Sequence, residues 1–187
     1  TAPAASAQPS ITVSAGTHPL SSQVSTAASA VNLPLTRVVL RANNGTARIN
    51  GFVIQLNGNV PRGAFVGAVR IDETTQTLYT DPVPFNTQNQ AVIPAILDLA
   101  QEKILTFGVR VTEKPELSTN QTFSVSLVAI NTETTVNGTL PITGVNTTIT
   151  APTTSAQPSI TVEPTSVVKS ITPNDNLAIG FIATNVN

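Results

Sequence analysis

Apolar and polar residues alternate with a period of two over several short stretches of the chain. Such alternation is typical of β-strands with one face buried and the other in water. Asn-Gly turns and prolines separate the stretches, because these residues favour turns and interrupt strands. The pattern predicts strands at 10–14, 35–42, 48–56, 64–72, 77–80, 90–96, 104–112, 122–131, 135–140 and 146–150.

Local signals add detail to this pattern. Asn43-Asn44-Gly45 favours a tight turn, and it predicts a β-hairpin over 35–56. Residues 15–32 are predicted to form a Ser/Ala-rich crossing without a strand, and 98–103 the one helical turn. Within 122–131, the side chains predicted to share one face are Phe123, Val125, Leu127 and Ala129.

Many short strands with almost no helix predict an all-β fold. We expect an antiparallel two-sheet sandwich, immunoglobulin-like or jelly-roll-like, with extended terminal strands. The composition agrees, since the chain is rich in the β-branched residues Thr, Val and Ile, and its 14 Pro and 10 Gly punctuate them.

A near-exact internal repeat sets the domain organisation. Residues 1–13, TAPAASAQPSITV, recur at 150–162 as TAPTTSAQPSITV, and only two positions differ. A repeat of this length predicts a chain built from copies of one domain. We therefore expect an N-terminal linker and strand at 1–14, a sandwich domain at 15–150, and a partial repeat of the domain start at 151–187.

Composition excludes several classes of function. The net charge is −1 and only 10% of residues are charged, which disfavours binding to nucleic acid or to an anionic membrane. No apolar run is long enough to span a membrane, and no signal peptide precedes the first strand. Cysteine is absent, so neither a disulfide nor a thiolate site is expected.

The sequence shows no catalytic constellation, so we predict that the chain is not an enzyme and needs no cofactor or metal. His18 is the single histidine and lies in a Ser/Ala/Pro stretch typical of a solvated loop. Asp72-Glu73 follows a strand, where calcium could bind, but a solvated acidic turn explains it better. No lysine lies within an apolar strand, as a Lys–Asn amide bond would require. A carbohydrate-binding module ranks last, because sugar stacking needs surface aromatics and the chain has no Trp and one Tyr.

Four Asn-x-Ser/Thr sequons are candidate N-glycosylation sites if the protein is extracellular and comes from an archaeon or a eukaryote. A chain rich in Thr and Asn also produces sequons by accident, and both alternatives stay open. The asparagines are Asn44, Asn120, Asn137 and Asn146.

Residues 35–56, LTRVVLRANNGTARINGFVIQL, together with the strand ITV at 11–13, resemble tandem immunoglobulin-like domains of prokaryotic surface-layer and surface-filament proteins. The resemblance covers most of residues 9–150 and rests mainly on strand and turn patterns. It implies an extracellular, cell-surface role in layers, stalks or fibres, and it transfers no catalytic residue.

The repeat and the resemblance together predict an extracellular structural protein. We expect it to polymerise head to tail into a surface filament by donor-strand-type complementation, in which one copy supplies a strand to a sheet edge of the next. Its partners would be copies of itself, with host or neighbouring-cell surfaces as further partners. The alternative is a fragment of a tandem-domain surface-layer protein or adhesin stalk. The candidate inter-subunit residues are Ile11, Val13, Ile160, Val162, Leu177, Ile179 and Phe181.

Overall fold

The computed structural model describes residues 7–17, 23–28, 30–72, 75, 77–151, 160–163 and 182–185. The chain divides into two compact units, Thr1–Pro152 and Thr153–Asn187. Among the described residues the secondary structure is almost entirely β, with a single short 3₁₀ turn, η1 at Arg62–Ala64. The predicted all-β class is confirmed.

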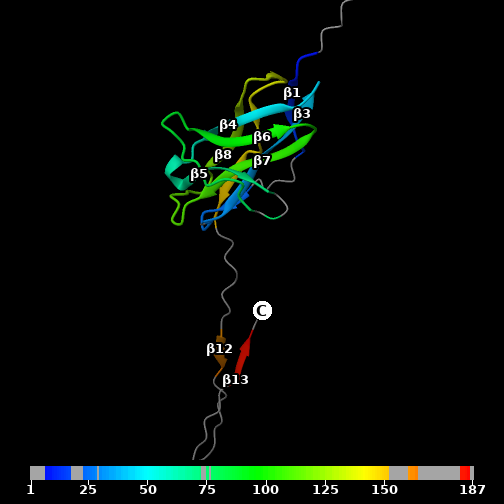
Figure 1. Cartoon of the computed structure of the whole chain (residues 1–187). Helices are drawn as coiled ribbons and strands as arrows, with labels where there is room; N and C mark the ends of the chain where they lie inside the picture. Colours follow the sequence, from blue (N-terminus) through cyan, green and yellow to red (C-terminus); the bar gives the residue numbers. More distant parts are fainter. Residues whose placement is uncertain are drawn as a thin grey trace, which may run out of the picture. The chain divides into compact units, whose positions relative to one another are not determined.

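Unit 1 is a two-sheet sandwich (Figure 1). Sheet A has five strands in the order β5-β7-β3-β1-β9. Their bounds are Ser10–Ala15 for β1, Asn32–Asn43 for β3, Phe65–Ile71 for β5, Lys103–Val111 for β7 and Thr135–Asn137 for β9.

Sheet B has the order β2-β11-β8-β4-β6, and β10 pairs with β8 beside this path. The bounds are Gln23–Ser25 for β2, Ala47–Gly58 for β4, Gln90–Leu99 for β6, Thr122–Thr132 for β8, Ile142–Thr143 for β10 and Thr147–Thr150 for β11. Most pairs are antiparallel, whereas β1–β9 and β2–β11 are parallel.

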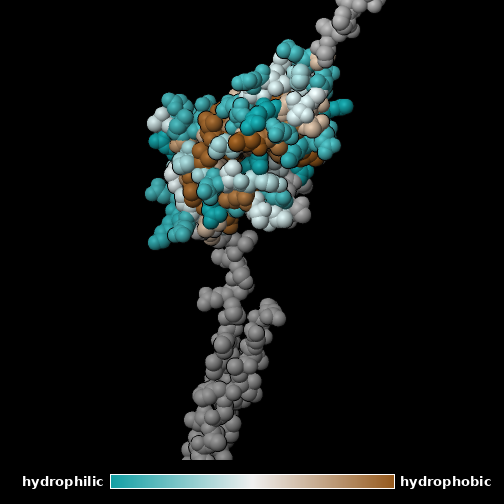
Figure 2. Space-filling view, viewed as in Figure 1, coloured by the Kyte–Doolittle hydropathy of each residue, from teal (hydrophilic) through white to brown (hydrophobic). Residues whose placement is uncertain are grey.

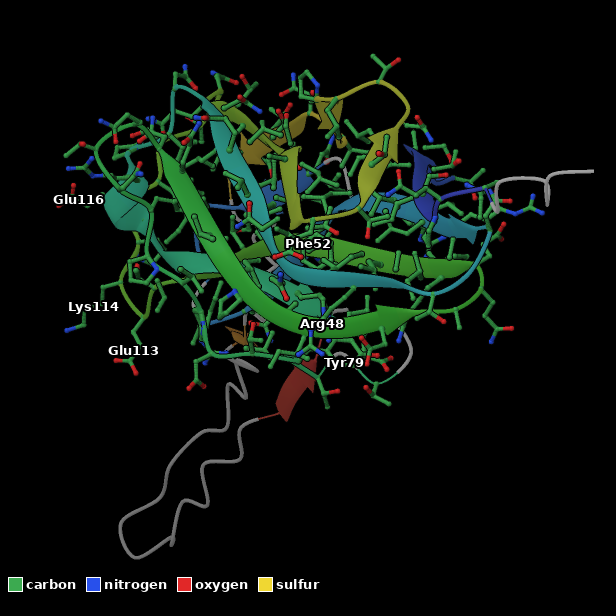
Figure 3. The ribbon with its side chains drawn as sticks, turned by 45° about the horizontal axis from the view of Figure 1, so that its top comes forward. Arg48, Phe52, Tyr79, Glu113, Lys114 and Glu116 are labelled. Carbon is green, nitrogen blue, oxygen red and sulfur yellow. The ribbon has the colours of Figure 1, made fainter. Side chains whose placement is uncertain are left out.

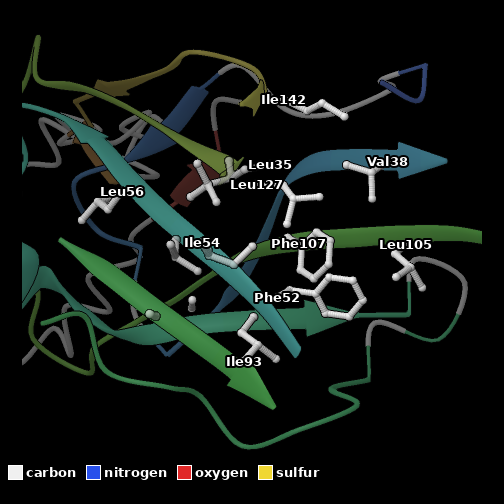
Figure 4. Packing of buried hydrophobic residues seen from close by; sticks show 14 of the residues in the cluster. Leu35, Val38, Phe52, Ile54, Leu56, Ile93, Leu105, Phe107, Leu127 and Ile142 are labelled. Carbon is white, nitrogen blue, oxygen red and sulfur yellow. The ribbon is translucent and has the colours of Figure 1, made fainter. Parts of the chain in front are cut away.

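The core lies between the sheets and is lined by the alternating apolar positions of both. Phe52 of β4 and Phe107 of β7 meet across it with ring centroids 5.0 Å apart and rings tilted by 56° (Figure 4). Phe65 of β5 and Phe123 of β8 form a second cross-sheet pair at 5.1 Å. Tilted pairs at this distance are favourable for aromatic rings, so the two pairs help to hold the sheets together.

The predicted hairpin over 35–56 is wrong. The turn itself forms, with Asn44 and Gly45 both at positive φ. However, β3 pairs with β1 and β7 in sheet A, whereas β4 pairs with β6 and β8 in sheet B. The connection therefore carries the chain from one sheet to the other, and each strand takes its hydrogen-bonding partners from distant parts of the chain.

Two further local predictions are also corrected. The helical turn at 98–103 does not form, because β6 runs through Leu99 and β7 begins at Lys103. The crossing at 15–32 does contain a strand, since β2 pairs in parallel with β11. A strand of three residues bounded by Ser-rich sequence leaves too little alternation to be recognised.

Ala129 does not share the core face of Phe123, Val125 and Leu127. In the pairing of β8 with β4, Val53 lies opposite Ala129 and Ile54 opposite Leu127, so one residue of β8 is left over. Such a bulge moves the following side chains to the other face.

Unit 2 is described only at β12, Ile160–Glu163, and β13, Ile182–Asn185. The two strands form an antiparallel pair in which Ile160 lies opposite Asn185 and Val162 opposite Ala183.

Candidate functional site

The first strand of unit 1 is fully integrated into its own sandwich. β1 lies between β3, which is antiparallel to it, and β9, which is parallel. Ile11 and Val13 point into the core and are 0% and 3% exposed, while Thr12 between them is exposed. Both predicted inter-subunit residues therefore fill a core position of this unit, and their exchange between copies stays a prediction.

The turn after β3 anchors the segment that leads into β1. The side-chain amide of Asn43 donates to the Thr12 hydroxyl at 2.9 Å, and that of Asn44 donates to the Gln8 carbonyl at 3.5 Å. A Cβ on Gly45 would lie 3.5 Å from the Pro9 ring. These contacts give the repeated segment a structural role, because Gln8, Pro9 and Thr12 all contact the Asn43-Asn44-Gly45 turn.

The β12–β13 pair of unit 2 resembles the β1–β3 pair of unit 1. Ile160 and Val162 are the repeat equivalents of Ile11 and Val13. Ile11 lies opposite Ala42 and Val13 opposite Leu40, whereas Ile160 lies opposite Asn185 and Val162 opposite Ala183. β13 is therefore antiparallel to the ITV strand of the tail, as β3 is to the ITV strand of unit 1.

The other predicted tail residues, Leu177, Ile179 and Phe181, lie outside the described residues. Their part in a contact between copies stays a prediction.

All four sequon asparagines carry exposed side chains on unit 1. Asn44 and Asn120 occupy turn positions with φ of 57° and 65°, Asn137 lies in β9 and Asn146 precedes β11. Their accessibility is what a modification enzyme requires, and glycosylation remains a prediction.

A surface feature that the sequence pattern does not reveal surrounds Tyr79, which is exposed on the outside of the sandwich (Figure 3). The Arg70 guanidinium lies over the Tyr79 ring, 4.2 Å from its centroid. The Tyr79 hydroxyl donates to Asp72 Oδ2 at 2.9 Å, and the Thr75 amide donates to Asp72 Oδ1 at 3.1 Å. The available signal was the single tyrosine, but the sequence does not show that Arg70 of β5 and Asp72, just after this strand, lie beside it.

The pKa values of Tyr79 and Arg70 are shifted by their surroundings in this cluster. The hydrogen bond to the Asp72 carboxylate raises the pKa of Tyr79, because ionisation would place two negative charges together. Burial lowers the pKa of Arg70, although a guanidinium stays charged at physiological pH. Tyr79 is therefore a neutral hydrogen-bond donor at neutral pH.

No metal-binding cluster is found among the described residues. No three His, Asp or Glu side chains come together there as a metal site, and His18 and Glu73 lie outside those residues. Lys103 and Lys114 are both exposed. No helix in the part that the structure describes is long and apolar enough to cross a membrane.

Comparisons with known proteins give only remote structural likeness. No family model matches the chain, and no curated protein matches it. Among solved structures, the chain is similar to self-complemented MyfA, the major subunit of Myf fimbriae from Yersinia enterocolitica, with a TM-score of 0.32 and 13% identity. The match covers 75% of this chain and 97% of that one. At this TM-score the two backbones differ too much for function to be transferred.

Proposed function

We propose that the protein is an extracellular structural subunit that polymerises head to tail into a surface filament. In the proposed assembly, Ile160–Val162 of one copy take the place of Ile11–Val13 in the next copy. The observation that supports the proposal is that the same three residues, ITV, form a strand with an antiparallel neighbour in both units.

The β1 position has the features of an exchangeable strand. β1 is the first strand of unit 1, so it can leave without threading the chain through the sandwich. Burial of an Ile or Val side chain stabilises by about 1.5–3 kcal/mol. Because Ile160 and Val162 are identical to Ile11 and Val13, they would recover the same stabilisation in that position. Exchange therefore costs little, as in domain swapping.

Such an exchange would use two different surfaces, the tail of one copy and the β1 position of another. A heterologous contact of this kind does not close unless its rotation happens to form a ring, so it generates a filament. Main-chain hydrogen bonds to β3 and β9 would supply affinity, and the pockets for the two apolar side chains would supply specificity.

A second candidate is a stalk of tandem units within one chain, in which β12 and β13 begin the next sandwich. Two observations favour it. The start of β1 and the end of β11 lie at opposite ends of unit 1 (Figure 1). The segment that leads into unit 1, TAPAASAQP, recurs after it as TAPTTSAQP, with two positions changed. Units of this kind join end to end without reversing direction.

Electron microscopy and sizing of the full 187-residue chain at rising concentration test the proposal. Val162→Asp places a carboxylate at the position equivalent to buried Val13, so it should abolish fibres while leaving unit 1 folded. Thr161→Asp is the matched control, because the equivalent Thr12 is exposed. We expect fibres from the wild type and from Thr161→Asp only.

Two outcomes would overturn strand exchange. Fibres from Val162→Asp would show that the ITV strand of the tail is not the donor. A monomeric wild type at every concentration would favour the tandem stalk instead.

A further inference from the structure

Two hollows on the surface of unit 1 meet at Tyr79 and share two lining residues. A hollow of about 320 Å³ on one side of the ring is lined by Arg37, Arg70, Asp72, Tyr79, Ile104 and Thr106, among others. A second hollow, of about 450 Å³, is lined by Asn50, Arg70, Tyr79, Thr80, Pro94 and Ile96, among others. Arg70 and Tyr79 thus stand between the hollows and line both of them.

The rims of these hollows carry the large apolar side chains that are most exposed. Ile96 is 80% exposed, Ile104 57% and Tyr79 53%. Apolar side chains also gather on the face where Figure 1 draws β4 and β6 (Figure 2). Exposed large side chains that converge on hollows, instead of being scattered singly, are typical of a binding surface.

Two arginines line the first hollow beside a single carboxylate, since Arg37 and Arg70 lie there together with Asp72. Both Asp72 oxygens already accept hydrogen bonds, from Tyr79 and Thr75. The lining therefore carries a net positive charge, and a ligand with an anionic group would complement it.

We propose that this Tyr79 surface binds an acidic saccharide. A carboxylate on the sugar would pair with the Arg70 guanidinium, which bonds planar anions in bidentate fashion. The apolar faces of the sugar rings would pack on Tyr79 and on the exposed isoleucines. The Tyr79 ring is preorganised for this task, since the Arg70 stack and the Asp72 hydrogen bond fix it from two sides.

The neighbouring strand argues against a peptide ligand. β6 is an edge strand, and an added peptide strand would have to pair with its main chain. Pro94 lacks an N–H group, and the register of β6 against β4 shifts between Pro94 and Leu97. Proline and bulges both protect sheet edges from strand addition. A ligand recognised through side chains, as sugars are, fits this edge better.

Titration calorimetry with the full chain tests the proposal, with oligogalacturonate as the probe and its methyl ester as the uncharged match. We expect the acid to bind and its affinity to fall as salt rises, because the ion pair is screened. Tyr79→Ala and Arg70→Gln should each weaken binding about tenfold or more, in line with a lost stacking or charged contact. Arg62→Gln, an exposed arginine that lines neither hollow, should bind like the wild type.

Further variants separate recognition from loss of fold. Tyr79→Phe keeps the ring, so it should retain most of the affinity, and thermal unfolding of each variant should match that of the wild type. Equal binding of the methyl ester, stronger binding of poly-glutamate, an equal loss in Arg62→Gln, or no binding of oligogalacturonate would each overturn the proposal. None of these outcomes bears on strand exchange, since Tyr79 lies in neither β1 nor the tail.

Discussion

The Thr36 hydroxyl of β3 donates a hydrogen bond to the main-chain carbonyl of Val125 in β8, so one buried side chain joins the two sheets. The same carbonyl accepts the amide of Gly144 at 2.9 Å, and the Val145 amide donates to the Leu35 carbonyl at 3.0 Å. Sheet A and sheet B are therefore connected by hydrogen bonds at this corner, in addition to the apolar packing between them.

Thr36→Val should lower the free energy of unfolding by about 1 kcal/mol, the usual net value of one hydrogen bond. The substitution keeps the volume, and the Val125 carbonyl retains its bond from Gly144, so no acceptor is left without a partner. Urea denaturation measures the change. Thr135→Val, at an exposed position in β9, is the control and should change stability by less than about 0.5 kcal/mol. An equal effect of both variants would contradict a specific role for the Thr36 hydroxyl.

Gly144→Ala should destabilise the sandwich by about 2–3 kcal/mol, as overpacking does elsewhere. A Cβ at this position would lie 1.9 Å from the Leu35 carbonyl oxygen and 2.3 Å from Thr36 Oγ1. Main-chain oxygen cannot move away without breaking the bond to Val145. Gly63 offers a matched control, because a Cβ there meets nothing within 4 Å. Thermal unfolding should show a clear drop for Gly144→Ala and little change for Gly63→Ala.

Phe52 and Phe107 should be coupled in a double-mutant cycle. Replacing each by Leu removes the ring contact at 5.0 Å, and the coupling energy should be about 0.5–1.5 kcal/mol. The control cycle combines Phe52→Leu with Val24→Ala. These residues lie in β4 and β2, three strand spacings or about 14 Å apart in sheet B. Their effects should add. Additivity in the Phe52–Phe107 cycle would show that the rings contribute only by their burial.

The Tyr79 hydroxyl should ionise at higher pH than a free tyrosine does, since its bond to Asp72 raises the pKa. The chain has one Tyr and no Trp, so near-ultraviolet absorbance during an alkaline titration reports this group directly. Asp72→Asn should move the midpoint back down, whereas Asp98→Asn should leave it in place. A midpoint unaffected by Asp72→Asn would contradict the hydrogen bond.

The same shift has a consequence for stability at alkaline pH. The folded pKa of Tyr79 lies above the unfolded one, so the contribution to stability is complete below an unfolded pKa of about 10 and is lost as pH rises through the folded pKa. Tyr79→Phe should flatten this alkaline decline. Chemical denaturation across that pH range measures it, and an unchanged slope in Tyr79→Phe would show that other groups cause the decline.

The sequence alone determined the class of the fold and much of the strand content. Alternation predicted the strand at 104–112, and it correctly placed Phe123, Val125 and Leu127 on the core face, because successive side chains of a strand point to opposite faces. The turn at Asn44-Gly45 was also predictable, since both residues tolerate positive φ. The repeat of TAPAASAQPSITV was visible without any structure.

Tertiary structure decided which strands pair and what lies beside them. β3 and β4 are joined by a tight turn and yet belong to different sheets, because pairing depends on distant strands that cover their edges. The face to which Ala129 points is decided by a bulge in the pairing of β8 with β4. The Tyr79 surface forms only because the fold brings residues of β5, β6 and β7 together. The local pattern indicates which side chains of a strand face the core. The neighbours of that strand are set by packing between residues far apart in the sequence, and the alternation within one strand gives no information about it.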